Sequence, residues 1–536
     1  MDQHSEAQIG RFLSRYPLHL VVLIGLVVAA AMGVWVGSGE FMKAGLIIAG
    51  AIAVGVTLAL GRNYWLLIPL AFCTDLPAIP IAGRNVELGE LAGVTCALTF
   101  LARYALKLQT FSLFRKNHAP FLLYAGWALM VFLIHPVGLS ASGAGLGGAR
   151  FYAKILIALI AFLVMANQEI RERECKWIII IILAGSVITE LKDIGTYFLP
   201  FLNESHAVMI SYEGDAFYTW HQALATAPTA FIMVMLARYR SSEIFGLQRG
   251  VWLISLFLVC ALFIVASGKR SAVVAIPLAA MTAALFRKEY AALFLWAGGT
   301  VLATTFLVVG HSASLFHLPL TAQRALSFLP GKWDSEMSMM EGGQDVFRDE
   351  LRRLATKKIK QDPWIGTGYQ IDLKLAEDLT YQYMVSGGDI EMQVTPAAMS
   401  SSWHNTWLGY AADFGIPASF LVGAIYLTVF RRSWRTFGQT PAKSPANTLA
   451  MYLLLFTVRD IAISYEGGHS ALDAYSRWWM YGLLVAIDLA NQQRLAAPKD
   501  AKVPPDGRTL LQPALAGQPA RQPLSQPLRV QRPSAF

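Results

Sequence analysis

Apolar runs of roughly 20 residues recur along most of this chain, and short polar connections separate them. An α-helix rises about 1.5 Å per residue, so each run is long enough to cross a hydrocarbon core of about 30 Å. In lipid only helices and closed barrels satisfy their own backbone, and these runs lack the two-residue alternation of a barrel strand. The pattern therefore predicts an all-α fold, a polytopic transmembrane helical bundle.

The same pattern predicts about 14 spans, the first of them an uncleaved span rather than a signal peptide. We place them near 18–37, 41–60, 64–82, 87–106, 119–137, 150–167, 177–198, 217–237, 251–268, 271–286, 289–310, 404–430, 447–466 and 473–490. Lys and Arg gather in alternate connections, as they do on the cytoplasmic side of membrane proteins. Both termini are therefore expected in the cytoplasm, and the long loop at 311–403 is expected outside.

Four parts follow from these spans. The chain divides into an N-terminal transmembrane bundle at 1–310, an outer loop domain at 311–403, C-terminal spans at 404–490 and a cytoplasmic tail at 491–536. The loop is too long to be a simple connector and predicts a helical domain. The tail is rich in Pro, Gln and Ala, cannot bury a core and is expected to be disordered.

Two features break the simple span pattern. The run near 64–82 contains Pro69, Pro77 and Pro80, which predicts a kinked or re-entrant segment. The run from Val251 to Leu285 would extend about 52 Å as one helix. Because that is too long for one span, we expect two short spans to meet at 267–271, where the sequence is SGKRS.

Lys269 and Arg270 in this junction face outward by parity, against the positive-inside trend. A charge at mid-bilayer costs about 2.5–3.5 kcal/mol on insertion scales, so two adjacent cations at an outer hairpin favour anionic neighbours. They can snorkel to lipid headgroups. They can also form a phosphate or diphosphate site, because a guanidinium matches phosphate oxygens with two parallel hydrogen bonds.

Residues 344–361 of the outer loop predict an amphipathic helix, with Asp345 as a candidate cap. Its apolar side would carry Val346, Leu351, Leu354 and Ile359, and Arg348 lies among the basic residues of the other side. Such a helix can lie on the membrane surface as a lid or present a solvated basic face. After it, DPWIGTGY at 362–369 predicts a stop and a turn.

Composition agrees with a membrane protein, since 55% of the residues are hydrophobic and 15% are charged. The net charge of +9 does not indicate nucleic-acid binding, because topology explains the basic loops. The four cysteines have no paired spacing, which indicates neither a disulfide framework nor a cysteine metal site. The sequence lacks a Walker loop and a G-x-G-x-x-G, so nothing suggests a nucleotide donor.

The candidate chemistry centres on His404, where the outer loop meets the next span. A lone histidine there is often only an interfacial hydrogen-bonding residue. However, Arg270, Arg324 and Arg348 are expected on the same side of the membrane. A neutral imidazole can accept a hydroxyl proton, and arginines can stabilise a departing phosphate group. His221, near the outer end of the span at 217–237, is a candidate acceptor-binding residue, with packing as the alternative.

Several motifs resemble the O-antigen ligase and Wzy-type polysaccharide polymerase superfamily. WHNTWL at 403–408 and DFGIP at 413–417 are similar to its H-N-x-x-L and G-I-P/G signature. SGKRSA at 267–272 resembles its S-x-S-R span start, with Lys269 and Ser271 departing from the usual small residues. AQRA at 322–325, Arg348 and PWIGTGY at 363–369 are similar to its outer loop. The resemblance covers about 250–430, and the chain has about two spans more than the family's usual twelve or so.

The resemblance implies a GT-C-like glycosyltransferase without metal or cofactor in the bacterial inner membrane, with a periplasmic active site. Its donor would be an undecaprenyl-diphosphate-linked oligosaccharide, and its acceptor a glycan or the lipid A core. Arg270 would bind the diphosphate with help from Arg324 or Arg348, and His404 would be the base or would position the acceptor. Lys269 and Asn405 would join substrate binding beside them. A polymerase, a ligase and a protein O-glycosyltransferase all fit.

A transporter or flippase of lipid-linked glycan is the alternative from another class, because many spans and outward cations suit it too. Such a protein should show internal repeats and paired broken helices near mid-membrane. We find no clear repeat, and the long outer loop that ends in His404 favours the enzyme.

Overall fold

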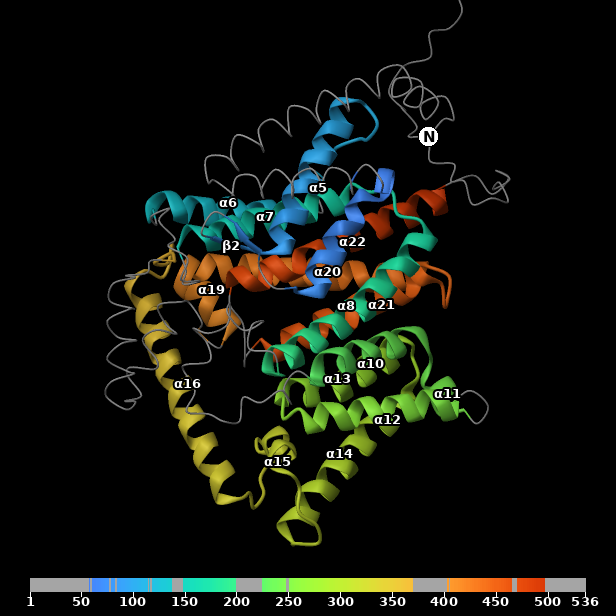
Figure 1. Ribbon diagram of the computed structural model, residues 1–536, viewed down its shortest axis with the longest axis vertical. Helices are drawn as coiled ribbons and strands as arrows, with labels where there is room; N and C mark the ends of the chain where they lie inside the picture. The colour runs from blue at the N-terminus through green and yellow to red at the C-terminus, as the bar shows by residue number, and fades with distance from the viewer. Residues whose placement is uncertain are drawn as a thin grey trace, which may run out of the picture. The chain divides into compact units, whose positions relative to one another are not determined.

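The computed structural model describes residues 57, 60–76, 79–81, 84–113, 115, 118–136, 148–198, 224–246, 250–369, 403, 405–464 and 470–496. Apart from Ala496, these residues belong to one compact unit, Phe41–Leu495. Helices make up nearly all of the regular structure in this part of the chain (Figure 1). The predicted all-α class is confirmed for it, with one two-stranded hairpin as the exception.

The elements follow each other along the chain as one nearly unbroken series of helices. They are η1 (Gly61–Leu66), α4 (Leu67–Thr74), β1 (Ile79–Ile81), β2 (Arg84–Val86), α5 (Leu88–Ala105), α6 (Ala119–Ile134), α7 (Ala149–Ala166), α8 (Glu172–Phe198), α10 (Thr226–Arg238), α11 (Ser241–Ile244), α12 (Gly250–Ala266), α13 (Arg270–Phe286), α14 (Tyr290–Ser312), α15 (Leu320–Leu326), α16 (Ser335–Gln361), α19 (Thr406–Phe414), α20 (Ile416–Gln439), α21 (Pro445–Ile463) and α22 (Ser470–Ala496). β1 and β2 pair antiparallel, with Ile79 opposite Val86.

Three of the described helices, α7, α14 and α21, are long and apolar enough to cross a membrane. Four others, α6, α10, α12 and α13, are apolar but shorter. Only 6% of the apolar window of α14 is buried, so this helix offers its side chains to the outside, whereas 67% of the window of α21 is buried. The predicted spans near 18–37 and 41–60 lie almost wholly outside the described residues, and the total of about 14 stays a prediction.

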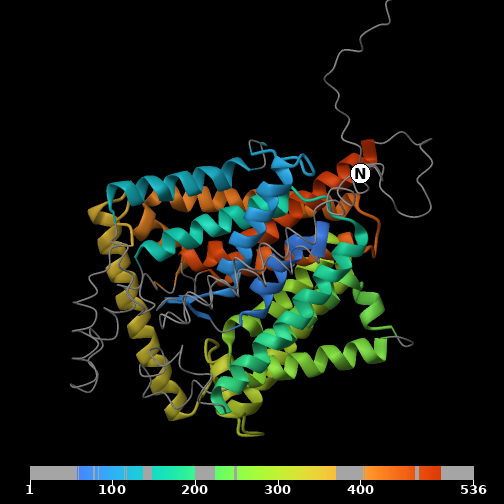
Figure 2. The same ribbon diagram turned by 45° about the horizontal axis from the view of Figure 1, so that its top comes forward.

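The helix α21 occupies the middle of the bundle. It packs against α20 on one side and against α8, α10 and α13 on others (Figures 1 and 2). On the far side of α20, α6 and α7 are joined by the stacked rings of Phe121 and Phe162, whose centroids are 4.0 Å apart. α21 therefore links the group of α10, α12 and α13 to the group of α6, α7 and α20.

The run near 64–82 is interrupted, as its prolines predicted: α4 ends at Thr74, Asp75 has a φ of +38°, and Pro80 lies in β1. The structure changes two details of the other predicted elements. The predicted span near 404–430 is two helices, α19 and α20, because Gly415 interrupts it with a φ of +79°. α22 continues to Ala496, beyond the predicted end at 490. The expected junction at 267–271 is confirmed, since α12 ends at Ala266 and α13 begins at Arg270.

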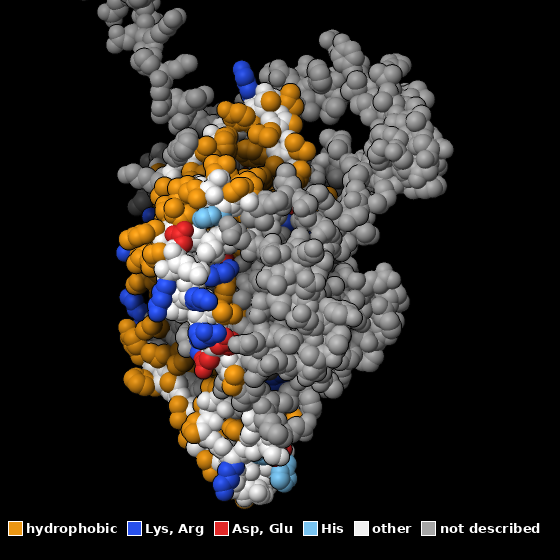
Figure 3. All heavy atoms as spheres, turned by 90° about the vertical axis from the view of Figure 1, so that its left-hand side faces the viewer, with side chains coloured by type: hydrophobic (Ala, Val, Ile, Leu, Met, Phe, Trp, Pro, Cys, Tyr) orange, Lys and Arg blue, Asp and Glu red, His pale blue; other side chains and the backbone are white. Residues whose placement is uncertain are grey.

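The amphipathic helix of the outer loop is present as α16, but it begins at Ser335 rather than beside Asp345. Leu351 is fully buried, and Leu354 and Ile359 pack with it, as predicted. The prediction for Val346 is wrong, because its side chain is 51% exposed. α16 runs from α15 to α19, and Figure 3, which faces this helix, shows Lys and Arg side chains gathered over it.

Candidate functional site

The turn between α12 and α13 packs directly on α15. Gly268 has a φ of +72°, and a Cβ at this position would lie 3.2 Å from the carbonyl oxygen of Thr321. Both facts favour glycine, which has no Cβ. The Ser267 hydroxyl donates to a carbonyl of the last turn of α12 at 2.6 Å and accepts the Lys269 N–H at 3.2 Å. These bonds fix the turn, so that α13 starts at Arg270.

Arg270 and Arg324 lie together at this turn. The Arg270 Nε donates to the backbone carbonyl of Arg324 at 3.2 Å, and the Ser327 hydroxyl donates to the same carbonyl at 2.8 Å. Both arginine side chains are partly buried, whereas Lys269 is exposed. We call Lys269, Arg270 and Arg324 the cation corner. The structure thus brings together two arginines that the sequence analysis selected from separate motifs, with Lys269 beside Arg270 in the chain.

The loop after α15 holds the cation corner in place through Gln323, which is buried. The side chain of Gln323 donates to the Asp334 carboxylate at 2.6 Å and accepts the Asp334 backbone N–H at 3.1 Å. This reciprocal pair ties α15 to the start of α16. Arg324, one residue further along α15, is therefore presented from a short helix that is fixed at both of its ends.

A second group of charges, which the sequence analysis missed, lies on α21 and α22. The Asp460 carboxylate is fully buried and forms ion pairs with Arg459, at 3.2 Å, and with Arg477, at 2.9 Å. Arg477 also donates to the Tyr426 hydroxyl at 3.1 Å. The signal was present in the sequence, because ionisable residues inside predicted spans are rare and usually functional.

This buried ion cluster adjoins the cation corner. Lys269 interacts electrostatically with Asp193 of α8, which stabilises its charge, and with Arg459, which repels it. The helices α13 and α21 also pack against each other, so Lys269, at the start of α13, and Arg459 of α21 belong to neighbouring elements.

Two glycine motifs meet backbone to backbone on the other side of the candidate site. The Thr367 and Gly368 N–H groups donate to the carbonyls of Ala412 and Asp413, at 3.1 and 2.8 Å. A Cβ on Gly366 would lie 2.5 Å from the Gly415 nitrogen, and a Cβ on Gly415 would lie 2.1 Å from the carbonyl oxygen of Trp364. Only glycine allows this approach. We call the contact between 362–369 and 413–417 the glycine clamp.

Asp413, within the clamp, is fully buried and accepts a hydrogen bond from the Trp403 indole at 3.1 Å. Trp403 is itself 1% exposed and packs on Leu351 and Ala355 of α16. The Lys358 ammonium lies 4.9 Å from the centre of the Trp403 ring. Burial lowers the pKa of Lys358, while the nearby Asp413 charge raises it. The clamp thus fixes α16 on α19 through one tryptophan.

Asn405 has a local structural role. Its side-chain oxygen accepts the Leu408 N–H at 3.0 Å and caps α19. The next residue, Thr406, donates its N–H to the Ser464 carbonyl at 2.9 Å, which ties the start of α19 to the end of α21. The predicted substrate contact of Asn405 is not tested by this cap, because the Nδ2 amide is a separate donor.

Arg348 lies on α16 and is partly buried. Its neighbours Arg352 and Arg353 pair with Asp349 and Glu350, three residues earlier on the helix. Among the described residues Arg348 forms no such ion pair, and its binding role stays a prediction. The predicted roles of His404 and His221 stay predictions, because both residues lie outside the described part.

Arg150, Tyr152 and Lys154 precede or begin a predicted span, and the structure gives each of them a structural contact. Lys154 pairs with Glu87 at 2.7 Å, and Arg150 lies 3.4 Å from Glu87. The Tyr152 hydroxyl accepts the Tyr369 N–H at 3.3 Å. These contacts join α7 to α5 and to the glycine clamp.

The fold and the site define a helical membrane protein. One stretch of its chain contains both the cation corner and the His404–Asn405 pair. Residues 255–423 match the family model described as O-antigen ligase. This segment carries the superfamily motifs from the α12–α13 turn to the glycine clamp, and the match supports the O-antigen ligase and Wzy-type superfamily. No curated protein matches the chain.

Proposed function

We propose that the protein is a membrane glycosyltransferase that moves an undecaprenyl-diphosphate-linked glycan onto an acceptor sugar hydroxyl at the periplasmic face of a bacterial inner membrane. One observation carries the proposal: Arg270 and Arg324 meet, with Lys269 next to Arg270 in the chain, within the segment that matches the O-antigen ligase model. The topology of about 14 spans, the outer placement of 311–403 and the four-part division belong to the same proposal.

The cation corner suits a diphosphate leaving group. Arginine offers planar N–H donors that match phosphate oxygens, and lysine adds a point charge. The Arg270 Nε donates to the Arg324 carbonyl, which fixes where the guanidinium lies at the start of α13. Donors held in advance where charge develops stabilise the transition state more than the ground state.

The reaction forms one bond and breaks one bond. The acceptor oxygen attacks the anomeric carbon of the donor sugar, and the bond from that carbon to the diphosphate oxygen breaks. The bonding electrons leave with undecaprenyl diphosphate, and the acceptor proton passes to His404, the proposed base. Attack from the side opposite the leaving group inverts the anomeric configuration. Arg348 and Asn405 would assist in binding, as would His221.

A glycan polymerase and a ligase to the lipid A core remain equally compatible with the described residues. A flippase would need the cation corner only to bind its lipid-linked substrate. Substitutions in the cation corner should then leave the glycan-transfer reaction on the outer face intact. A glycosyltransferase and a flippase therefore differ in which lipid-linked intermediate accumulates when a residue of the cation corner is substituted.

The test compares strains that carry wild type, Arg270→Ala or His404→Ala at matched levels of membrane protein. Arg353→Ala is the control, because Arg353 pairs with Glu350 on the exposed side of α16. Surface glycan length and lipid-linked intermediates are measured in each strain. We expect the first two variants to lose the transferred glycan and the control to keep it.

The intermediate that accumulates then separates the activities. Lipid-linked single repeats on the outer face indicate a polymerase, and lipid-linked full-length polymer indicates a ligase. Accumulation of the lipid-linked glycan on the cytoplasmic face would instead indicate a flippase. An unchanged glycan profile in both variants would refute the glycosyltransferase.

A further inference from the structure

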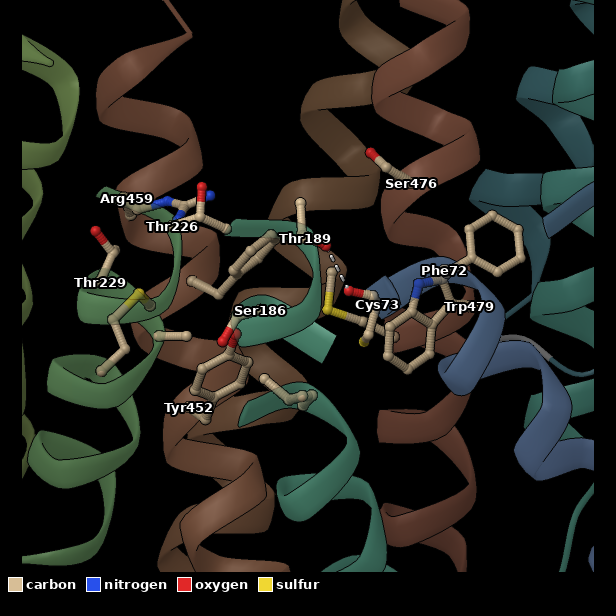
Figure 4. Close-up of a pocket in the computed structure, with 15 residues that line it drawn as sticks. Phe72, Cys73, Ser186, Thr189, Thr226, Thr229, Tyr452, Arg459, Ser476 and Trp479 are labelled. Atoms are coloured by element: carbon tan, nitrogen blue, oxygen red, sulfur yellow. Dashed lines mark hydrogen bonds between the residues drawn. The ribbon is translucent and has the colours of Figure 1, made fainter. Parts of the chain in front are cut away.

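A cavity of about 190 Å³ lies among α4, α8, α10, α21 and α22 (Figure 4). Its lining is rich in hydroxyl groups, which come from Ser186, Thr189, Thr226, Thr229, Tyr452 and Ser476. Aromatic rings of Phe72, Phe456 and Trp479 complete it, and Arg459 is its single charged lining residue. A hydroxyl-rich, aromatic lining inside an apolar helix bundle indicates a polar ligand with apolar faces.

Three polar atoms of the lining residues lack a hydrogen-bond partner among the described residues. They are the Thr229 hydroxyl oxygen, the Arg459 Nε and the Trp479 Nε1, all buried. A buried polar group without a partner costs free energy, so native proteins satisfy it with water or a ligand. The Arg459 Nε needs an acceptor, and the Thr229 hydroxyl can donate or accept.

The cavity lies beside the helix that begins at Arg270 of the cation corner. This helix, α13, packs on α10 and on α21, and both of these helices line the cavity. Figure 4 shows Arg459 and Thr226 close together at one end of the cavity, and Tyr452 lies at the other. Thr226 begins α10, and Arg459 lies one turn before the end of α21. Both helix ends are on the side where the topology predicts the periplasm.

The volume limits what the cavity can hold. It is far larger than the roughly 10–15 Å³ that one water needs. It is smaller than the roughly 300–1,000 Å³ of pockets for drug-sized ligands. A single sugar ring fits this range, whereas an oligosaccharide does not.

We infer that this cavity binds the one sugar ring that is attached to the diphosphate of the lipid-linked donor. The inference rests on the proposed function and adds a subsite to it. The hydroxyl lining would exchange hydrogen bonds with the sugar hydroxyls, and the aromatic rings would pack on its C–H faces. Arg459 would donate to an oxygen at the junction of sugar and phosphate. The enzyme would then recognise the first sugar of the donor and not the length of the glycan behind it.

The test measures binding to the full-length protein in lipid nanodiscs with two probes. One is undecaprenyl diphosphate, and the other is the lipid-linked glycan extracted from the cells that encode the protein. The variants Thr229→Val and Tyr452→Phe each remove one lining hydroxyl with little change of shape. Thr428→Val is the matched control, because Thr428 is partly exposed on α20, does not line the cavity, and donates its hydroxyl to the Ala424 carbonyl of its own helix.

For the wild type we expect tighter binding of the glycan-bearing lipid than of the bare diphosphate. Each cavity variant should weaken the binding of the glycan-bearing lipid by about three- to tenfold, which is the effect of losing one buried hydrogen bond. The affinity for the bare undecaprenyl diphosphate should not change. The control should change neither. Equal losses for both probes, or no loss for either, would overturn the sugar subsite.

Failure of the subsite and failure of the proposed function give different results. If the wild type binds both lipids equally well, the sugar subsite is wrong and the diphosphate site stands. If the wild type binds neither lipid, the donor assignment falls and the subsite falls with it.

Discussion

The cation corner and the glycine clamp lie in the same family-matched segment but are built in opposite ways. The cation corner joins its helices through a side chain, the Arg270 guanidinium, on a backbone carbonyl. The clamp joins its segments through backbone contacts at Gly366 and Gly415, and its one carboxylate, Asp413, is buried and hydrogen-bonded. The cation corner thus holds charged side chains together at a turn, while the clamp holds two backbone segments in close contact. Substitutions in the cation corner should therefore lower activity, and substitutions in the clamp should lower the stability of the fold.

The largest effect is expected in the clamp, from Gly415→Ala. The new Cβ would lie 2.1 Å from the Trp364 carbonyl oxygen, and the φ of +79° is unfavourable for alanine. Backbone strain and overpacking each cost about 1–3 kcal/mol, so we expect a loss of roughly 2–6 kcal/mol in the free energy of unfolding. Thermal unfolding in detergent measures it.

Gly438→Ala is the matched control for this clamp substitution. A Cβ at Gly438, on α20, would meet nothing within 4 Å. Alanine also favours a helix by up to about 1 kcal/mol over glycine, so this variant should be as stable as wild type or more so. Equal melting temperatures for the two alanine variants would contradict the clamp.

The next effect is expected in the cation corner, from Arg270→Lys. The substitution keeps the charge but loses the planar fork and the Nε bond to the Arg324 carbonyl. We expect glycan transfer to fall by about 10- to 100-fold, or roughly 1.4–2.7 kcal/mol of transition-state stabilisation, with an unchanged melting temperature. Arg353→Lys on α16 should retain full activity. If Arg270→Lys lowers the melting temperature but leaves glycan transfer unchanged, the cation corner serves stability rather than activity, and the comparison with the clamp is wrong.

Asn405 can sharpen the comparison, because it combines a helix cap with a predicted substrate contact. Asn405→Ala should cost about 1 kcal/mol of stability, since it removes the cap on the Leu408 N–H. Asn405→Asp keeps an acceptor oxygen for the cap but loses the Nδ2 donor. If Asn405→Asp has wild-type stability and reduced transfer, the amide binds substrate. If it is also fully active, Asn405 serves α19 alone.

The smallest effect is expected from pH acting on Lys358, over the Trp403 ring. Burial holds the pKa of Lys358 below its ordinary value in the folded protein. Between the folded and the unfolded pKa the unfolded chain binds more protons, so this residue's contribution to stability should rise as pH increases through that window. Lys358→Met should flatten the rise in melting temperature on the alkaline side. Lys357→Met, at an exposed neighbour, should leave it in place.

Local sequence signals predicted the elements of this protein well. Apolar runs became helices, and the excessive length of the run from Val251 to Leu285 correctly placed the turn at 267–271. The prolines of 64–82 indicated a broken segment, and α4 does end at Thr74. Four local predictions differ from the structure: the start of α16, the side on which Val346 lies, the break at Gly415 and the end of α22. A helical period leaves the exact ends of a helix and its neighbours undetermined.

The sequence also selected the residues of the cation corner, because outward cations between apolar spans are costly and therefore informative. Their approach to one another depends on how α15 packs on Gly268, which no local pattern contains. The same holds for the clamp, where Gly366 and Gly415 come from distant segments, and for Asp460, whose partner Arg477 lies on another helix.

Periodicity and chain-breaking residues are local properties, so the sequence by itself determined the helices, the α12–α13 turn and the candidate cations. Contacts between remote segments depend on packing, and only the tertiary structure decided the cation corner, the clamp and the hydroxyl-lined cavity beside Arg459.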